Sequence, residues 1–154
     1  MNTKPLRSEL LCDIKLDLED VERIGETPRG DRQIYYVKGG EFEGPKLKGR
    51  VRSRGGDWLV RRSDGVDDLD VRLTLETDDG ALIYVSYRGL LHVPPEVAER
   101  LGRGEAVDHG EYYFRTTPVF ETAAAQYAWL NRIVAVGVGE FGDGWVAYTI
   151  HAIL

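Results

Sequence analysis

Short runs of alternating apolar and polar residues cover most of this chain. Glycine and proline, 18 and 6 in number, are spread between these runs along the whole length. Period-two alternation is typical of half-buried strands, and short strands separated by Gly or Pro are typical of antiparallel sandwiches and barrels. The pattern predicts strands near residues 9–18, 32–38, 45–53, 57–62, 68–77, 81–88, 110–117, 130–139 and 145–153.

Two hairpin turns are the most specific local signals. Asp78-Asp79-Gly80 stands between the runs 68–77 and 81–88, and Asp-Gly supplies the positive φ that a tight hairpin turn requires. Gly142-Asp143-Gly144 is expected to form the last hairpin in the same way. These turns indicate that consecutive strands pair antiparallel.

Helix is scarce in this sequence. Pro94-Pro95-Glu96 predicts a short helix that ends at Gly102, because proline suits the first turn and glutamate complements the positive end of the helix dipole. The alanine-rich segment 122–127 predicts one or two further helical turns. An all-β fold follows: a single antiparallel barrel of about eight to ten strands over residues 1–154, with residues 1–8 as a loose N-terminal segment.

The polar sides of several strand-like runs carry side chains that are unusual for a solvated surface. These side chains are Asp70, Arg72, Tyr84, Tyr113, Arg115, Trp129 and Asn131. We favour an arrangement in which the polar sides face the barrel interior and line one cavity, because tryptophan and paired Asp and Arg are uncommon choices for an exterior. In the reverse arrangement, aliphatic residues such as Val71 and Leu73 fill an ordinary packed barrel.

An acid–base set can be drawn from these residues. Asp70 lies two positions before Arg72 on one strand face, and a carboxylate beside a guanidinium stays ionised, as a general base must. The candidate oxyanion donors and carbonyl-binding groups are Tyr84, Tyr113, Arg115 and Asn131. The alternative is a buried hydrogen-bond network that only fixes the register of the barrel.

The turn Gly55-Gly56-Asp57-Trp58 leads into a predicted strand. Trp58 is expected to cap one end of the barrel, where its indole would form an apolar wall with one donor. Asp57 suits two roles, a further catalytic carboxyl or a carboxylate that binds backbone in the turn. Trp129 is likewise either a core plug or part of a pocket wall.

Charge narrows the classes of function. The net charge of −6 and the isoelectric point of about 5.1 argue against nucleic-acid binding, which needs a clustered basic face. One cationic row stands on a single side of a strand, and it comprises Lys46, Lys48, Arg50, Arg52 and Arg54. For this row we favour a solvated outer face over an anion-binding role.

Cofactor and metal motifs are missing from the sequence. The three histidines, at 92, 109 and 151, lie far apart and lack the spacing of metal ligands. Cys12 lies in an apolar run, where a buried hydrophobe in a reducing compartment is expected. With no signal peptide or membrane-length apolar segment either, we expect a cytoplasmic protein without cofactor, metal or membrane partner.

Several segments, in order along nearly the whole chain from about residue 10 to 154, also carry a resemblance. They are Gly39–Pro45, Gly55–Trp58, Leu69–Arg72, Asp79–Tyr84, Tyr113–Thr116, Phe120–Thr122 and Tyr127–Arg132. The chain resembles the domain of unknown function 3237 family (uncharacterised protein family 0311). The resemblance implies a lipocalin-like antiparallel β-barrel, often found as a small assembly, and a homodimer is therefore considered.

The recurrent polar positions of that family map onto Asp57, Trp58, Asp70, Arg72, Tyr84, Arg115, Glu121 and Asn131. The chain departs from the family pattern in two places. Ser53-Arg54 replaces a Pro-Gly turn, and Ala123-Ala124-Ala125 replaces a loop rich in Gly, Asp and Pro. The alanine run favours a helical turn at that place.

Three functions compete on these residues. The first is a cofactor-independent isomerase, tautomerase or cyclase that acts on a small aromatic or polyketide-like carbonyl compound. The second is a non-catalytic barrel that binds a small organic molecule bearing a carboxylate or enolate. The third is a structural protein whose polar residues satisfy one another. We favour the first, with Asp70, Tyr84, Arg115 and Asp57 as catalytic residues and Arg72, Trp58, Trp129, Asn131, Glu121 and Tyr113 as substrate-binding residues.

Overall fold

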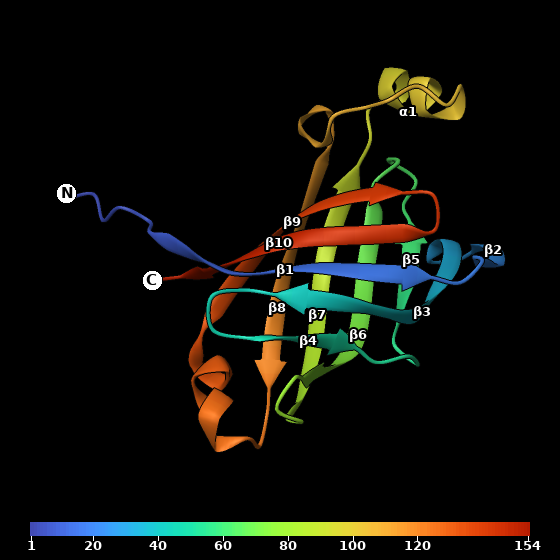
Figure 1. Cartoon of the computed structure of the whole chain (residues 1–154). Coiled ribbons are helices and arrows are strands. Elements are labelled where there is room, and N and C mark those ends of the chain that lie inside the picture. The colour runs from blue at the N-terminus through green and yellow to red at the C-terminus, as the bar shows by residue number, and fades with distance from the viewer.

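The computed structural model describes residues 1–154, and ten β-strands dominate it (Figure 1). The strands are β1 (Ser8–Leu18), β2 (Glu22–Thr27), β3 (Gly30–Glu43), β4 (Lys48–Val51), β5 (Gly56–Arg61), β6 (Asp67–Thr77), β7 (Leu82–His92), β8 (Tyr113–Glu121), β9 (Val134–Gly142) and β10 (Trp145–Ile153). All of their pairings are antiparallel.

The strands close into a barrel. They follow the order β1-β10-β9-β8-β7-β6-β4-β3, and pairing of β1 with β3 completes the ring. After β4, the chain returns in β5 between β3 and β6, and β2 pairs with the first half of β3. The structure is thus a closed eight-stranded antiparallel barrel with two additional strands, which confirms the predicted fold.

Three short helices lie outside the ring. They are α1 (Pro95–Gly102) and the 3-10 helices η1 (His109–Glu111) and η2 (Ala125–Arg132). The helix predicted after Pro94 is confirmed, whereas the second helical piece lies further along the chain than the alanine run alone indicated. In Figure 1, α1 and η2 lie at opposite ends of the barrel. None of the helices is long and apolar enough to cross a membrane.

Both predicted hairpin turns are confirmed, whereas β8 and β9 begin three and four residues later than predicted, after η1 and η2. Gly80 and Gly144 adopt φ of +87° and +76° in the two predicted hairpins. The sequence pattern missed β2, whose Glu-Arg-Ile-Gly-Glu-Thr run has no apolar alternation, and it underestimated β3, which continues through Gly39 and Gly40.

Aliphatic side chains, and not polar ones, fill the barrel. On β6, Leu69, Val71, Leu73 and Leu75 are each 1–2% exposed, and the intervening polar residues point outward. The expectation of a polar interior is therefore wrong. The interior of an eight-stranded barrel has room for its own side chains or for one small ligand. Burial of aliphatic groups is favourable, while burial of charges costs several kcal/mol each.

The end of the barrel near η2 is closed by packing and hydrogen bonds. Leu130 of η2 is 1% exposed. The Tyr127 hydroxyl donates to Asp79 Oδ1 at 3.0 Å and so fixes η2 to the β6–β7 turn. Asn131 holds the other side of η2, because its Oδ1 accepts from the Thr122 N–H at 2.8 Å and its Nδ2 donates to the Thr122 carbonyl at 2.9 Å.

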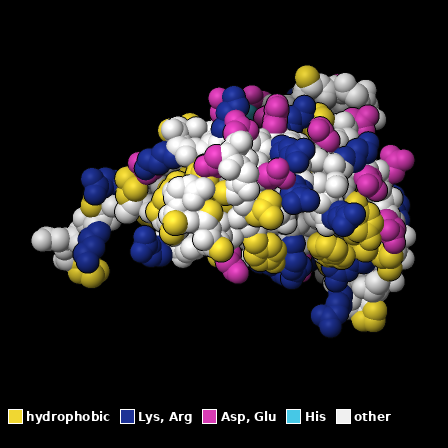
Figure 2. Space-filling model, turned by 60° about the horizontal axis from the view of Figure 1, so that its bottom comes forward, with side chains coloured by type: hydrophobic (Ala, Val, Ile, Leu, Met, Phe, Trp, Pro, Cys, Tyr) yellow, Lys and Arg dark blue, Asp and Glu magenta, His cyan; other side chains and the backbone are white.

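The outer surface carries mixed charges. On the face seen in Figure 2, basic and acidic side chains are interspersed. Four members of the predicted cationic row form ion pairs with acids: Lys46 with Glu9 at 3.5 Å, Lys48 with Glu43 at 3.4 Å, and Arg50 and Arg52 with Glu76 at 3.1 and 3.8 Å. This part of the row is the solvated outer face that the sequence analysis favoured.

Candidate functional site

A cavity of about 230 Å³ lies inside the barrel, toward the end opposite η2. Its wall is mainly apolar and includes Leu16, Leu59, Leu69, Val71, Phe114 and Val146. The polar groups that reach it are few, and they come from β3, β5, β6, β7 and β10. An apolar pocket with a few convergent polar groups is the usual form of a small-molecule site.

Asp57 is one of two carboxyl groups that line this cavity, the other being Asp67. Asp57 lies on β5 opposite Val71 of β6, and both side chains point inward. The β5–β6 ladder pairs residues on either side of Asp70 but not Asp70 itself. Instead, the Asp70 backbone N–H donates to Asp57 Oδ1 at 3.0 Å. The carboxyl is therefore fixed in place by backbone.

The environment of Asp57 favours the protonated acid. Burial raises the pKa of Asp57 to about 7, with a further contribution from the negative charges of Asp70 and Asp67. The hydrogen bond from the Asp70 N–H opposes this shift and is the smaller effect. A carboxyl group that titrates near neutrality can both accept and return a proton.

Two tyrosines project into the interior near this carboxyl. Tyr87 and Tyr148 are 7% and 4% exposed, and their rings meet edge to face with centroids 5.4 Å apart. Burial raises the pKa of both phenols. The adjacent Tyr148 hydroxyl raises the pKa of Tyr87 further, and the charge of Asp57 adds to the rise for both phenols. The Tyr87 hydroxyl is buried next to that of Tyr148, but the geometry of this contact is not that of a hydrogen bond, and no other partner is within reach. A buried polar group without a partner is rare in native proteins and indicates a position that a ligand or water would fill.

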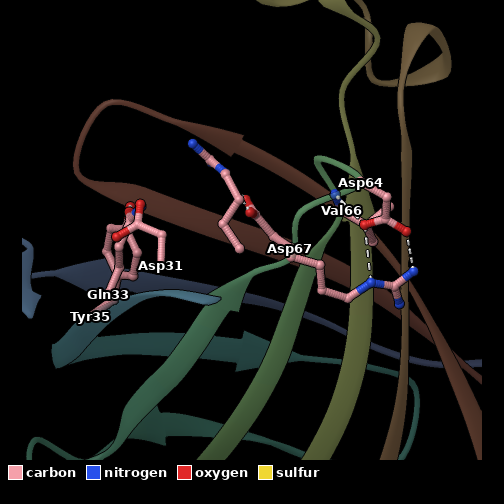
Figure 3. Close-up of polar contacts among 8 residues, drawn as sticks. Asp31, Gln33, Tyr35, Asp64, Val66 and Asp67 are labelled. Carbon is pink, nitrogen blue, oxygen red and sulfur yellow. Dashed lines mark hydrogen bonds and ion pairs between the residues drawn. The ribbon is translucent and has the colours of Figure 1, made fainter. Parts of the chain in front are cut away.

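Three more polar residues, Tyr35, Arg61 and Asp67, line the cavity. The Tyr35 hydroxyl donates to Gln33 Oε1 at 3.2 Å, and Gln33 Nε2 donates to Asp31 Oδ2 at 2.9 Å, as Figure 3 places them on β3. On the adjacent strand β5, Arg61 donates two hydrogen bonds to the buried carboxylate of Asp67, at 2.7 and 2.9 Å. These hydrogen bonds fix the polar groups beside an apolar interior.

Most of the residues predicted for the site lie on the outside of the barrel. Asp70 pairs with Arg72 and Arg88 there, each at 3.2 Å, and the Arg72 guanidinium lies 5.9 Å from the Trp58 ring. The prediction of one shared interior cavity is therefore wrong. Ion pairing and cation–π contacts between neighbouring strands explain these side chains on an exterior.

The remaining predicted residues are scattered. Tyr84 is 41% exposed and Tyr113 is 54% exposed. Tyr84 faces Glu121 across β7 and β8, and Arg115 lies over the Tyr113 ring at 5.2 Å. None of these four lines the cavity. Their individual roles stay predictions, but the structure does not bring them together with Asp57.

Three other predicted residues have observed structural contacts. Trp58 packs edge to face with Tyr36 on the outer surface and does not cap the barrel. Trp129 packs partly against the core, with Lys46 Nζ 5.4 Å from its ring. Asn131 forms hydrogen bonds with the backbone of Thr122 and does not line the cavity.

Sequence reasoning missed Tyr87 and Tyr148 as site residues. Each stands on a strand side that is otherwise aliphatic, Tyr87 with Val85 and Tyr148 with Ile150. A tyrosine on an otherwise aliphatic side of a strand could have indicated a site residue, because the hydroxyl of a buried phenol needs a hydrogen-bond partner.

Comparison with known proteins places the chain in a family. The family model described as "Protein of unknown function (DUF3237)" matches residues 6–153. The UPF0311 protein of Rhodopseudomonas palustris strain CGA009 is 35% identical over 152 residues, which are 99% of this chain and 99% of that protein. Its crystal structure has a TM-score of 0.92 and covers 99% of this chain and 100% of that chain.

Two further solved structures share the fold. A β-barrel-like protein from Acinetobacter baumannii AYE is 39% identical, with a TM-score of 0.87 and 99% of each chain covered. A protein described as an enzyme from Penicillium herquei is 20% identical, with a TM-score of 0.74 and coverage of 100% of this chain and 98% of that chain. The latter likeness concerns the fold alone. The chain belongs to the DUF3237 family of proteins of unknown function.

Proposed function

We propose that this protein is a cofactor-independent isomerase or cyclase that acts on a small carbonyl compound, with Asp57 as its acid–base group. One observation carries the proposal: a carboxyl group with its pKa raised to about 7 lines an apolar cavity beside an unpartnered buried phenol. Perturbed carboxyl groups of this kind are concentrated at catalytic sites.

The chemistry follows from the groups at hand. The Asp57 carboxylate takes a proton from the carbon next to the substrate carbonyl, and the C–H electron pair moves to the carbonyl oxygen. The Tyr87 and Tyr148 hydroxyls donate hydrogen bonds to that oxygen, since phenols with raised pKa stay protonated. In an isomerisation of an unsaturated ketone, the Asp57 acid returns the proton to the far carbon of the dienolate, and the C=C bond shifts. In a cyclisation, the enolate carbon attacks a second carbonyl carbon of the same molecule, the π bond of that carbonyl is lost, and its oxygen takes the proton from Asp57.

The cavity restricts the size and polarity of the substrate. Its volume of about 230 Å³ is below the usual range for drug-sized ligands, roughly 300–1,000 Å³. The wall is mainly hydrophobic, so a compact ring compound fits it better than a sugar or a polar acid. The fold also accommodates catalysis elsewhere, because the Penicillium herquei protein of the same architecture is described as an enzyme.

The proposal is tested by proton exchange at carbon. In D₂O near neutral pH, 1-indanone and 2-tetralone would be incubated with the protein, and deuterium uptake next to the carbonyl followed by ¹H NMR. The wild type is expected to accelerate uptake, and Asp57→Asn to lower the rate about 10²–10⁴-fold, the usual contribution of a positioned base. Asp70→Asn is the matched control, because this carboxyl lies outside the cavity. Its charge is a minor cause of the raised pKa of Asp57, so this variant is expected to stay far closer to the wild-type rate than Asp57→Asn.

A binding barrel is the second candidate, and the mainly apolar lining of the cavity favours it. Saturable binding of these ketones without exchange would support this candidate and contradict catalysis. Equal loss of exchange in Asp57→Asn and Asp70→Asn would instead indicate that Asp57 has no special part in the reaction.

A further inference from the structure

A second hollow, on the outer surface of the barrel, has a different chemistry. It is a groove of about 580 Å³ between the chain that follows β4 and the outer sides of β6 and β7. Its polar lining consists of Arg52, Ser53, Arg54, Arg72, Thr74 and Tyr84. Three guanidinium groups therefore border one groove on a protein whose net charge is −6.

No carboxylate lines the groove. Two of the acids near it form ion pairs, and a third, Glu121, lies opposite Tyr84 on the next strand. Glu76 accepts two hydrogen bonds from Arg50, both at 3.1 Å, and lies 3.8 Å from Arg52. Asp70 is shared between Arg72 and Arg88. Arg54 has no carboxylate within 4.0 Å, unlike Arg50 and Arg52 of the same cationic row.

Arg54 also has an unusual backbone conformation. Its φ is +80°, and it is the one residue other than glycine with a positive φ. Glycine or asparagine would adopt this conformation more easily than arginine. A residue held in a disfavoured conformation without an internal partner points to a role for its side chain outside the fold itself.

We propose that this groove binds a diphosphate group. Guanidinium groups match phosphate oxygens with two parallel hydrogen bonds, and three of them can surround adjacent phosphates. The Ser53 and Thr74 hydroxyls are further donors at the same groove. Tyr84, 41% exposed, offers a ring on which a base attached to the diphosphate would stack. The site is independent of the Asp57 cavity on the other side of the barrel wall.

Isothermal titration calorimetry with pyrophosphate and with ADP tests the proposal. The wild type is expected to bind pyrophosphate at low ionic strength and more weakly as salt increases. Arg54→Asn, which keeps a residue that tolerates positive φ, and Arg72→Gln are each expected to weaken binding at least about tenfold. Lys46→Gln is the matched control, because Lys46 belongs to the same cationic row but lies outside the groove, and it should bind like the wild type.

The outcomes separate clearly. Tighter binding of ADP than of pyrophosphate supports the site with a nucleotide as ligand, and equal affinities support it with a free diphosphate. Absence of binding at millimolar pyrophosphate would overturn the proposal. Equal pyrophosphate affinities of Arg54→Asn, Arg72→Gln and Lys46→Gln would also overturn the proposal. Binding would then depend on the net charge of the protein and not on the groove. A thermal melt of each variant confirms that it is folded.

Discussion

Asp57 accepts a hydrogen bond from the backbone N–H of Asp70 at 3.0 Å, and yet the two carboxyl groups lie on opposite sides of the barrel wall. Asp57 points into the apolar cavity, whereas Asp70 pairs with Arg72 and Arg88 outside. The two strands therefore provide one carboxyl in an apolar environment and one in a surface ion-pair network. This pair also supplies matched variants for several of the tests below.

The unfolding free energy of the wild type should decrease as pH rises from about 4 to about 7. The pKa of Asp57 is raised from the ordinary 3.8 to about 7 in the folded protein, so over this interval the folded state binds the proton more tightly than the unfolded chain. The full shift corresponds to a loss on the order of 4 kcal/mol. Urea denaturation at several pH values measures it.

Asp57→Asn should abolish the decrease in unfolding free energy between about pH 4 and pH 7. It should also be more stable than the wild type at about pH 8, since asparagine keeps an oxygen for the Asp70 N–H but does not ionise. Asp70→Asn should retain most of the decrease, because burial is a larger cause of the Asp57 pKa shift than the charge of Asp70. If the decrease persists in Asp57→Asn, the titrating group is a different one.

Tyr87→Phe should leave stability unchanged or raise it by about 1 kcal/mol. The Tyr87 hydroxyl is buried without a hydrogen-bond partner, and removal of an unsatisfied polar group relieves its desolvation cost. The same variant should slow deuterium exchange of the ketones, because one donor to the enolate oxygen is lost. A clear loss of stability, measured by chemical denaturation, would show that the hydroxyl has a partner in solution.

Asn131→Ala should destabilise the protein by about 1–3 kcal/mol, because it leaves the Thr122 N–H and carbonyl without their side-chain partners. Deuterium exchange per folded molecule should be unchanged, since Asn131 does not line the cavity. Reduced exchange at unchanged stability would restore the substrate-binding role that the sequence predicted for this residue.

Gly139→Ala should destabilise the barrel by about 1–3 kcal/mol. A Cβ at this position would lie 2.6 Å from the ring of Phe114, where β8 and β9 approach closely. Gly102→Ala is the control, because a Cβ there meets nothing within 4 Å. Equal thermal melting temperatures for the two variants would contradict the close packing of Phe114 on Gly139.

Much of the fold could be predicted from the sequence because its signals are local. Asp-Gly turns require positive φ, and period-two alternation marks the strands. The β2 strand was missed because it is polar on both sides, so its pairing with β3 depends on backbone contacts that leave no sequence pattern.

The site was harder to predict, because alternation defines two sides of a strand but not which of them is buried. On β6 the prediction of a polar interior depends on Asp70 and Arg72, whose pairing is typical of a binding site as well as of a surface. Outside, Asp70 is shared by two arginines and Arg72 also contacts Trp58. Arg88 and Trp58 belong to the neighbouring strands β7 and β5, so the sequence of β6 alone does not reveal these two partners. Asp57 was ambiguous between a backbone-binding and a chemical role, and the structure gives it a backbone hydrogen bond within the cavity wall.

The most direct test of the account is a ¹³C NMR titration of the aspartate carboxyl carbons, with Asp57 assigned by its absence from the Asp57→Asn spectrum. Burial in the apolar cavity is expected to place the Asp57 midpoint at about 7. The chemical shift of Tyr87, whose pKa the charge of Asp57 raises, should follow the same titration. A midpoint near the ordinary 3.8 would show that this carboxyl is hydrated in solution, and the proposed acid–base site would be wrong.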